Sequence, residues 1–489
     1  MPHTREIFLD HASTTPVHPQ VLGLMLPFFG NHYALPSSPF SAGEKPRTAL
    51  AEARSRVASL IGAQASEIIF TASGTEANNL AIMGTAAAAR EARRHVIVSA
   101  IEHASVLNTA LHLKDTGFQA TVLPVVAGGL VDPAMVEGSI RDDTALVSVM
   151  HAGNETGVIQ AVEAIGRIAR ERGVIFHCDC VQSAGRIPVD VNAMNVDLLC
   201  LSSHKIYGPK GAGALYVREG TPVSPVLFGS PKERGLRPGA LNMPAVVGFG
   251  KACEAALVDL ESHASHVAGL RDLLEQEMTA RIPGLIVNGS AVPRVPHLSS
   301  ISFEGVLADS LAAWLDLEGI TVSPRASLFS RRPSHALAAL DLPAGLAFGT
   351  VRFSPGWENT ADEMRQAAEA VGHAVTRIRE FALLVQDDTV CIITIASRNH
   401  VRRSLKAMDA AGIPCAVTSR PIELDHLSGP RTALAVPCPK QDEAARILRV
   451  HKIGVTGMNR LKGMCRQRGA EEVRFWNKAA DIKRDNRRN

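Results

Sequence analysis

Short apolar runs alternate with amphipathic stretches between about residue 50 and residue 255. Helices are predicted by stretches such as "GTEANNLAIMGTAAAAREA" and "AVEAIGRIARERG". Strands are predicted by seven runs: "EIIFTAS", "HVIVSA", "QATVLPV", "ALVSVMH", "VIFHCD", "VDLLCLS" and "GALYV". Near-continuous apolar strands separated by helices are typical of a parallel sheet covered on both faces. We therefore expect an α/β unit with a mainly parallel seven-stranded sheet, whose ligand binds outside the carboxyl ends of the strands.

The pattern changes after this unit. One long helix is predicted over "KACEAALVDLESHASHVAGLRDLLEQEMTARI", followed by the short strands "SSISFEG" and "GTVRFSP". These elements indicate a smaller α+β domain, completed by the N-terminal arm. From residue 386 the order of predicted elements is βαββαβ, which is the ferredoxin-like split motif. The expected domains are a large unit (16–255), a small α+β unit (1–15 and 256–384), a ferredoxin-like unit (386–466) and a basic polar tail (467–489).

Composition narrows the class of protein. The 489 residues are 46% hydrophobic and 20% charged, which is ordinary for a soluble globular enzyme. A net charge of +3 argues against nucleic acid as the main partner. Neither a signal peptide nor a membrane-spanning run is evident. Eight thinly spread cysteines indicate free thiols in a reducing compartment, so the cytoplasm is the expected location.

A lysine stands in an unusual place in "SSHKIYGPKG". Lys205 follows the apolar run "VDLLCL" and precedes a Gly/Pro-rich turn. An amine there suits a covalent anchor for a carbonyl cofactor. If that cofactor carries a phosphate, the start of the helix at Ser73-Gly74-Thr75 offers backbone N–H groups, and Ser202 and His204 add donors. Small polar residues also begin most helices, so the helix start alone is weak evidence.

A buried carboxylate is a second requirement, because it keeps a pyridine nitrogen protonated. "FHCDCVQS" puts Asp179 at a strand end, with Gln182 three residues on. Strand alternation predicts that Asp179 points away from Cys178 and Cys180. A helix cap or turn residue is the alternative for Asp179. A metal site is the alternative for "HCDC", but the same alternation would divide its ligands between two faces.

Three further polar residues lie near predicted strand ends or inside a strand. His103 in "SAIEHASV" follows a strand and could stack on a flat ring, and Asn154 in "MHAGNETG" also follows a strand. Arg352 in "GTVRFSPG" is an arginine inside an apolar strand, which suits bidentate binding of an amino acid carboxylate. Taken singly, each is more simply an ordinary polar or surface residue.

Together these motifs resemble a known family. "FLDHASTTP", "IIFTASGTEANNLAI", "EHASV", "MHAGNETGVIQ", "FHCDCVQSAG", "SSHKIYGPKGAGALYV" and "VRFSPG" are similar to the motifs of NifS/IscS-type cysteine desulfurases, from about residue 7 to residue 380. These enzymes belong to the class V aminotransferase group of fold-type I enzymes, which use pyridoxal 5'-phosphate. The resemblance implies an L-cysteine substrate, sulfur transfer in iron–sulfur cluster assembly, a protein acceptor and a homodimer.

The resemblance also implies roles for individual residues. Lys205 forms the internal aldimine and moves the α-proton of the substrate. His103 stacks on the ring and acts in proton transfer. Cofactor and substrate contacts are assigned to Gly74, Thr75, Ser202 and His204 at the phosphate, Asp179 at the pyridine nitrogen, Gln182 at the ring oxygen, and Asn154 and Arg352 at the substrate.

The chain departs from the family on the sulfur-accepting side. Family members carry an attacking cysteine on a loop before the arginine strand, whereas "GITVSPRASLFSRRPSHALAAL" has Ser327, Leu328 and Phe329 there. A serine hydroxyl is hardly ionised near neutral pH, so it replaces a thiol poorly. The usual Asn-Pro-Ser-Ser is Leu35-Pro36-Ser37-Ser38, with no histidine before Gly43. The usual Arg-x-Gly-Thr, whose threonine reaches the partner subunit's phosphate, is Arg237-Pro238-Gly239-Ala240.

The C-terminal unit resembles a small group of proposed sulfur/selenium carrier domains, although Ser428-Gly429 stands where they have Cys-Gly. Of the nearby thiols, Cys391 and Cys415 fall in predicted strands, and Cys465 lies near the end. Cys438 precedes a predicted helix, where the helix dipole favours a thiolate, so we hypothesise that it receives sulfur. An inert thiol is the simpler interpretation.

Three functions stay open from the sequence. The first is a desulfurase-like enzyme that acts on cysteine or a close analogue. The second is a selenocysteine or cysteine-conjugate lyase, or an aminotransferase, which needs no loop thiol. The third is a desulfurase-derived scaffold without activity. Because the cofactor and carboxylate residues are all present, we favour the first.

Overall fold

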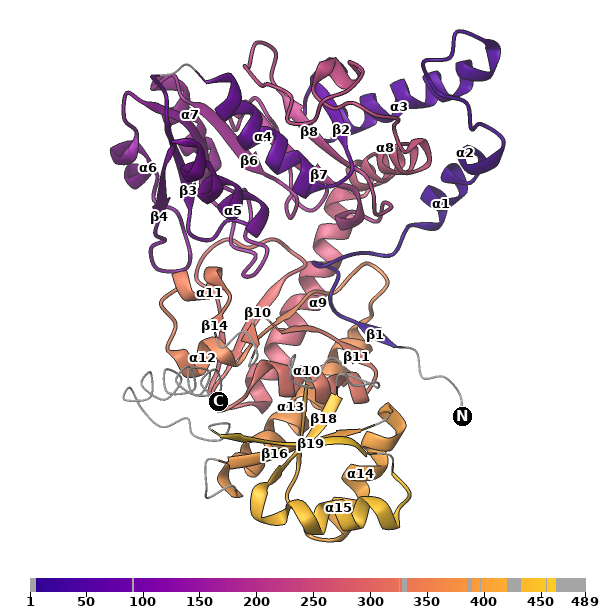
Figure 1. Cartoon of the computed structure of the whole chain (residues 1–489), viewed down its shortest axis with the longest axis vertical. Helices are drawn as coiled ribbons and strands as arrows, with labels where there is room; N and C mark the ends of the chain where they lie inside the picture. Colours follow the sequence, from indigo (N-terminus) through magenta and orange to yellow (C-terminus); the bar gives the residue numbers. More distant parts are fainter. Residues whose placement is uncertain are drawn as a thin grey trace, which may run out of the picture.

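The computed structural model describes residues 6–89, 92–324, 326–327, 332–384, 389–395, 397–419, 432–453 and 455–462. The chain forms three tiers along its longest axis (Figure 1). The large sheet and its helices make the first tier, a smaller antiparallel sheet with two long helices makes the middle one, and the C-terminal unit makes the last. Leu328, Phe329, Ser428, Gly429, Cys465 and the predicted tail lie outside the described residues.

Seven strands form the large sheet, in the order β2-β8-β7-β6-β5-β3-β4. They are β2 (Ile68–Thr71), β3 (His95–Ser99), β4 (Gln119–Leu123), β5 (Thr144–Ser148), β6 (Ile175–Asp179), β7 (Leu198–Ser202) and β8 (Gly213–Val217). β8 runs antiparallel to both of its neighbours, β2 and β7, whereas the other neighbouring pairs are parallel. The predicted mainly parallel sheet is confirmed, and each predicted strand is present.

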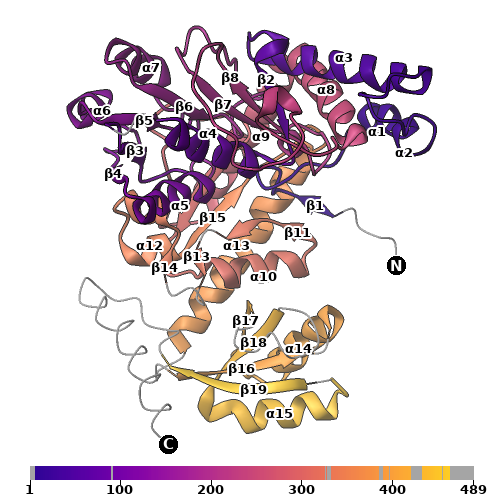
Figure 2. The same cartoon turned by 45° about the horizontal axis from the view of Figure 1, so that its top comes forward.

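Helices cover both faces of this sheet, as expected for strands that are apolar on both sides (Figure 2). The hydrophobic core on one face includes side chains of α4 (Gly74–Ala88) and α5 (Ala104–His112). The core on the other face includes α3 (Glu44–Leu60), α6 (Pro133–Ser139), α7 (Val162–Glu171) and α8 (Met243–Val258). The short helices α1 (Pro19–Met25) and α2 (Pro27–Gly30) extend from the N-terminal arm.

The middle tier contains a four-stranded sheet in the order β12-β15-β10-β9. Its strands are β9 (Leu285–Val287), β10 (Ser299–Phe303), β12 (Ser323–Pro324) and β15 (Thr350–Phe353). The N-terminal arm joins this tier, because β1 (Ile7–Phe8) pairs with β11 (Ile320–Thr321) and Asp10 bridges Ser354. Its helices are α9 (Leu260–Arg281), α10 (Ala308–Leu317), α11 (His335–Ala339), α12 (Ala344–Phe348) and α13 (Ala361–Leu384).

One predicted element is wrong. The single long helix expected from residue 251 to residue 282 is two helices, α8 and α9, which meet at Asp259. Asp259 has φ −96° and ψ 10°, outside the helical range, and its carbonyl accepts from the amide of His263 in the second helix. Helical periodicity continues across such a joint, so the sequence pattern did not show it.

The C-terminal tier is a four-stranded antiparallel sheet in the order β17-β18-β16-β19. Its elements are β16 (Thr389–Ile395), α14 (Arg398–Ala410), β17 (Ala416–Ser419), β18 (Thr432–Pro437), α15 (Gln441–Val450) and β19 (Val455–Lys462). This is the ferredoxin-like order that the sequence predicts. Ala313 and Leu317 of α10 belong to the hydrophobic core of this unit, so it packs directly on the middle tier. No helix within the described ranges is long and apolar enough to cross a membrane.

Candidate active site

The carboxyl ends of β2, β6 and β7 meet at one edge of the large sheet. Asp179 is the last residue of β6 and Ser202 the last of β7, and α4 begins at Gly74 just after β2. A Cβ added to Gly74 would lie 2.9 Å from Val181 Cγ2 and 3.3 Å from Ser202 Cβ. Only a glycine therefore lets the helix start come this close to the two strand ends.

Lys205 lies at this edge, in the 3-10 turn Ser203–Lys205 that follows β7. Its Nζ donates to the carbonyl oxygens of Ala12 (2.6 Å) and Ser13 (2.7 Å). Gln182 Nε2 also donates to the Ala12 carbonyl, at 3.0 Å. The N-terminal arm thus joins two residues that the sequence predicts for the same site, although they come from different loops.

Asp179 is buried, with 6% of its surface exposed. Its Oδ2 accepts from Asn78 Nδ2 (2.8 Å), and its Oδ1 accepts from the backbone N–H of Val181 (2.9 Å). Among the described residues no cationic side chain hydrogen-bonds with this carboxylate. A buried acid whose partners are all neutral suits a ligand that brings its own positive charge.

Arg352 is the third part of the site and is 2% exposed. Its Nη2 donates to Asp10 Oδ1 (2.8 Å) and to Ser13 Oγ (2.5 Å), and its Nη1 donates to the backbone carbonyl of Asn154 (2.5 Å). Its Nε is buried with no partner in the described part of the chain. Ser13 contacts Arg352 through its hydroxyl and Lys205 through its carbonyl, so the arm links the amine and the guanidinium.

Burial sets the charge of the groups around the site. Burial, together with the charges of Lys205 and Lys210, lowers the pKa of His204 to about 4. His204 is therefore neutral at neutral pH, and its Nδ1 lies 3.2 Å from Thr14 Oγ1. Burial also raises the pKa of Glu102 to about 8, despite hydrogen bonds from Ser99 and Met150. Glu102 therefore stays protonated near neutral pH.

The remaining predicted residues lie along the same edge. His103 is the N-cap of α5 and is exposed. Thr75 is also exposed, in the first turn of α4. Asn154 contributes its backbone carbonyl to Arg352. Arg237 forms an ion pair with Glu76 of α4 at 3.0 Å, so the altered segment that ends at Ala240 is tied to the helix that begins at Gly74.

The loop that carries a cysteine in the resembled family is a short hairpin here. Its strands are β13 (Ala326–Ser327) and β14 (Arg332–Pro333). Just after it, Ser334 Oγ donates to Glu155 Oε2, and His335 Nε2 lies 2.7 Å from the carbonyl oxygen of Glu102. These contacts attach the end of the hairpin to the large sheet. The sequence between Cys253 and Cys391 contains no cysteine.

The described thiols are poorly placed to replace that cysteine. Cys178 and Cys180 are fully buried, with their sulfur atoms 3.7 Å apart, so they share the face that alternation predicts. Burial raises the pKa of the Cys200 and Cys253 thiols. Within the described part of the chain five cysteines are free, but Cys391 is disulfide-bonded, which corrects the expectation that the cysteines are free thiols. No cluster of three or more metal-ligating side chains is present in the described ranges.

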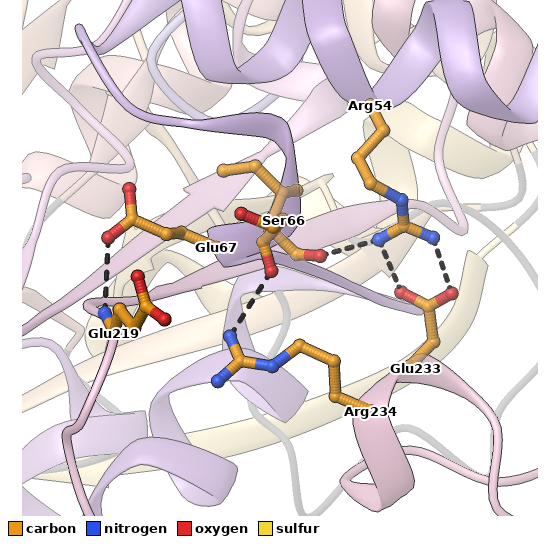
Figure 3. Close-up of a pocket in the computed structure, with 7 residues that line it drawn as sticks. Arg54, Ser66, Glu67, Glu219, Glu233 and Arg234 are labelled. Carbon is orange, nitrogen blue, oxygen red and sulfur yellow. Dashed lines mark hydrogen bonds and ion pairs between the residues drawn. The ribbon is translucent and has the colours of Figure 1, made fainter.

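A separate cavity of about 480 Å³ lies at the opposite edge of the sheet, near the start of β2 and the end of β8 (Figure 3). Four of its charged side chains, Arg54, Glu67, Glu233 and Arg234, bind one another or the backbone. Arg54 makes two bonds to Glu233, at 2.6 and 2.8 Å, and Arg234 donates to the backbone carbonyl of Ser66 at 3.2 Å. These bonds join the loop that carries Glu233 and Arg234 to the sheet. The cavity is separate from the candidate active site.

Sequence reasoning missed Asn78 and Ser105, which connect Asp179 to His103. Two adjacent asparagines in the middle of α4 were a usable signal, because asparagine is a poor helix former. The arm contacts were missed because backbone carbonyls carry no mark in a sequence.

Comparisons with known proteins agree with this geometry. The aminotransferase class-V family matches residues 7–366. Cysteine desulfurase IscS of Dictyoglomus turgidum is 40% identical over 385 residues, which are 78% of this chain and 98% of that protein. The chain belongs to the cysteine desulfurases of the class-V aminotransferase family. The solved structure of a NifS-like protein is 33% identical with a TM-score of 0.71. The alignment covers 76% of this chain and 99% of the NifS-like protein.

A second solved structure, titled SspA in complex with cysteine, is 35% identical with a TM-score of 0.64 and covers 72% of this chain and 99% of that one. Class-V aminotransferases are enzymes that depend on pyridoxal 5'-phosphate. The site fits this group on its own chemistry: a half-buried amine, a buried carboxylate without a cation, and a helix start kept open by Gly74. The family match ends at residue 366 and leaves the C-terminal unit uncovered.

Proposed function

We propose that this protein is a pyridoxal 5'-phosphate-dependent cysteine desulfurase that removes sulfur from L-cysteine and passes it to an acceptor thiol. The observation that carries the proposal is the pair of cations joined by the N-terminal arm. Lys205 and Arg352 both contact Ser13, so an anchoring amine and a carboxylate-binding guanidinium lie on either side of one residue. An α-amino acid needs both groups at this spacing.

The cofactor would be held by Lys205, Asp179, Gln182, Ser202, His204 and the first turn of α4 at Gly74 and Thr75. When bound, it supplies an aldehyde for the substrate amine and a ring that withdraws electrons from the α-carbon. Asp179 would keep the ring nitrogen protonated, because its buried carboxylate is stabilised by a nearby positive charge. The neutral imidazole of His204 leaves the positive charge near the phosphate to Lys210 and the helix start.

Arg352 would bind the substrate carboxylate. Its Nε has no partner among the described residues, so it has a donor to offer, and Asp10 and Asn154 fix the plane of the guanidinium. Lys205, once its amine is released, is the group that moves the proton of the α-carbon. The neighbouring structure titled in complex with cysteine supports this choice of substrate.

The sulfur must go to a thiol outside the hairpin, because residues 254–390 contain no cysteine. In a balanced form, L-cysteine and an acceptor thiol give L-alanine and a persulfide: the C–S bond breaks, an S–S bond forms, and the carbon is reduced. We propose that Cys438, which begins a 3-10 turn just before α15, is one such acceptor. The Cys438→Ala variant tests this, since full sulfur transfer in that variant contradicts the role.

The proposal includes an oligomeric state and a location in the cell. A homodimer is supported by exposed apolar side chains on α1, on α2, on the segment after α2 and on the segment between β8 and α8: Leu22, Leu26, Phe29, Tyr33, Phe40, Leu227 and Phe228. We propose a cytoplasmic enzyme in iron–sulfur cluster assembly, with the cofactor in the large unit (16–255), the substrate arginine in the small one (1–15 and 256–384) and a carrier-like unit at 386–466.

A second candidate function is a cysteine or selenocysteine lyase, favoured by the missing hairpin cysteine. The deciding experiment incubates the purified protein with L-cysteine and a reducing thiol, and measures alanine, pyruvate and sulfide. Equal amounts of alanine and sulfide are expected for a desulfurase, whereas pyruvate with sulfide indicates a lyase. Lys205→Ala is the control and should lose both the products and the cofactor absorbance. Cofactor absorbance without any product would point to a scaffold.

A further inference from the structure

Four side chains form a continuous line of hydrogen bonds beneath the site. Asp179 Oδ2 accepts from Asn78 Nδ2 at 2.8 Å, and the same Nδ2 donates to Ser105 Oγ at 2.9 Å. Ser105 Oγ lies 2.7 Å from His103 Nδ1. Asn78 is 1% exposed and Ser105 is 8% exposed, so water competes little with these bonds. Neither Asn78 nor Ser105 has a role in the function proposed above.

The Asn78 amide fixes the direction of these hydrogen bonds, that is, which atoms donate and which accept. An ionised carboxylate only accepts hydrogen bonds, so the atom that faces Asp179 must be the amide nitrogen. Rotating the amide would turn its oxygen toward the Asp179 carboxylate and lose that bond. The two N–H groups of Asn78 therefore point to Asp179 and Ser105, while its Oδ1 has no partner among the described residues.

The tautomer of His103 follows from that direction. Ser105 Oγ already accepts from Asn78, so its own hydrogen is available for His103 Nδ1. The backbone N–H of Ser105 also donates to Nδ1, at 3.1 Å. A nitrogen that receives two donors carries no hydrogen itself, and in a neutral imidazole the hydrogen is then on Nε2.

We propose that Asn78 and Ser105 are positioning residues that hold His103 as its Nε2–H tautomer, so that His103 offers the site a hydrogen-bond donor. This inference rests on the proposed function, which makes the residues around Lys205 an active site. The resemblance to the cysteine desulfurases implied that His103 takes part in proton transfer. With Nδ1 occupied and Nε2 already protonated, a neutral His103 has no free nitrogen to accept a proton. Lys205 is then the base that carries the α-proton, while His103 stabilises developing negative charge.

The test is to observe the tautomer directly by ¹⁵N NMR of holoenzyme labelled with ¹⁵N-histidine. The His103→Gln variant identifies the His103 signals by their loss. At neutral pH the wild type should show hydrogen on Nε2, in both the holoenzyme and the cofactor-free chain. Asn78→Ala and Ser105→Ala should each add a signal for the Nδ1–H form. In both variants kcat should fall on the order of tenfold with KM unchanged, as for other supporting residues of a site.

Asn79→Ala is the matched control, because Asn79 is the adjacent asparagine on α4 and contacts Thr75 and Thr109 instead. It should leave the His103 signals and kcat as in the wild type. Hydrogen on Nδ1 in the wild type, or unchanged His103 signals in both variants, overturns the proposal. Cofactor absorbance is recorded on the same samples: its absence from the wild type defeats the proposed function, while the cofactor-free spectrum still decides the tautomer.

Discussion

Burial governs the charge of Glu102, the residue before His103. Desolvation raises its pKa from its ordinary value of 4.5 to about 8, against the opposing hydrogen bonds from Ser99 Oγ (2.6 Å) and the Met150 amide (2.9 Å). A pKa raised on folding gives stability that is complete below pH 4.5 and is lost as the pH rises through 8. Glu102 therefore makes the folded protein less stable on the alkaline side.

The first prediction concerns Glu102→Gln, which keeps the size and the accepting oxygen but cannot ionise. Between pH 5 and pH 8 the wild type should lose about 1.4 kcal/mol of unfolding free energy per pH unit relative to the variant. Denaturant unfolding at several pH values measures this difference. Glu137→Gln, at an exposed ion pair, is the control and should run parallel to the wild type. If the unfolding free energy of Glu102→Gln varies with pH as that of the wild type does, the raised pKa of Glu102 is refuted.

The second prediction concerns the ion pair of Asp10 and Arg352. Asp10→Ala leaves a guanidinium that is 2% exposed without its carboxylate, so it should lower the unfolding free energy by about 3 kcal/mol. An added amino acid can supply the missing negative charge. Excess L-alanine should therefore raise the melting temperature of the variant more than that of the wild type. An equal shift in both proteins would mean that Arg352 does not bind the ligand carboxylate.

At the scale of single residues, the sequence singles out side chains whose charge is unusual for their place in the chain. Lys205 and Asp179 stand out because a charged side chain beside a buried strand needs a reason. Asn78 and Ser105 did not stand out, because their meaning depends on a partner from another element. Ala12 acts through its carbonyl oxygen, which every residue has.

At the scale of elements, apolar runs predicted the strands of the large sheet, because a strand buried on both faces has little polar content. The reversed direction of β8 had no signal, since an apolar run reads the same in either direction. The joint at Asp259 was missed for a similar reason, as both helices continue one period.

The loop between β8 and α8 holds backbone strain. Glu233 and Arg234 have φ values of 46° and 57°, which non-glycine residues rarely adopt, and Gly235 follows at 82°. The Glu233 carboxylate accepts from Arg54 and from the backbone N–H of Phe70 at 2.7 Å. These bonds offset the unfavourable backbone and fix the segment that leads to Arg237.

The third prediction is that Glu233→Ala lowers the unfolding free energy by about 3–5 kcal/mol, since the Glu233 side chain is only 4% exposed and its removal leaves Arg54 without its carboxylate partner. Denaturant titration gives the value. Asp143→Ala breaks the exposed pair with Arg141 and should cost about 0–1 kcal/mol. Similar losses in the two variants would argue that the loop is not held by this pair.

At the scale of the whole molecule, the first tier leaves several large apolar side chains exposed. Phe29 is 66% exposed, Phe40 is 74% exposed and Phe228 is 88% exposed, all on segments of the first tier. A monomer rarely leaves three such rings in water, so a second copy of the chain is the expected cover.

The fourth prediction is that Phe29→Glu combined with Phe228→Glu converts the protein from a dimer to a monomer in sedimentation velocity at micromolar concentration. A charge on each side of a buried contact costs more than the apolar area gains. Val450→Glu, on α15 of the last tier and 73% exposed, should leave the mass unchanged. A monomeric wild type, or a double variant that still sediments as a dimer, would contradict the assigned surface.

Helix α10 belongs to two hydrophobic interiors at once. Leu311 and Leu315 face the middle tier, whereas Ala313 and Leu317 are packed among the side chains of the last one. A truncated enzyme that ends after α13 would expose these two apolar side chains to solvent, because the last tier would no longer cover them. Truncation of the chain to the length of its shorter relatives should therefore give insoluble protein, unless Ala313 and Leu317 are first replaced by polar residues.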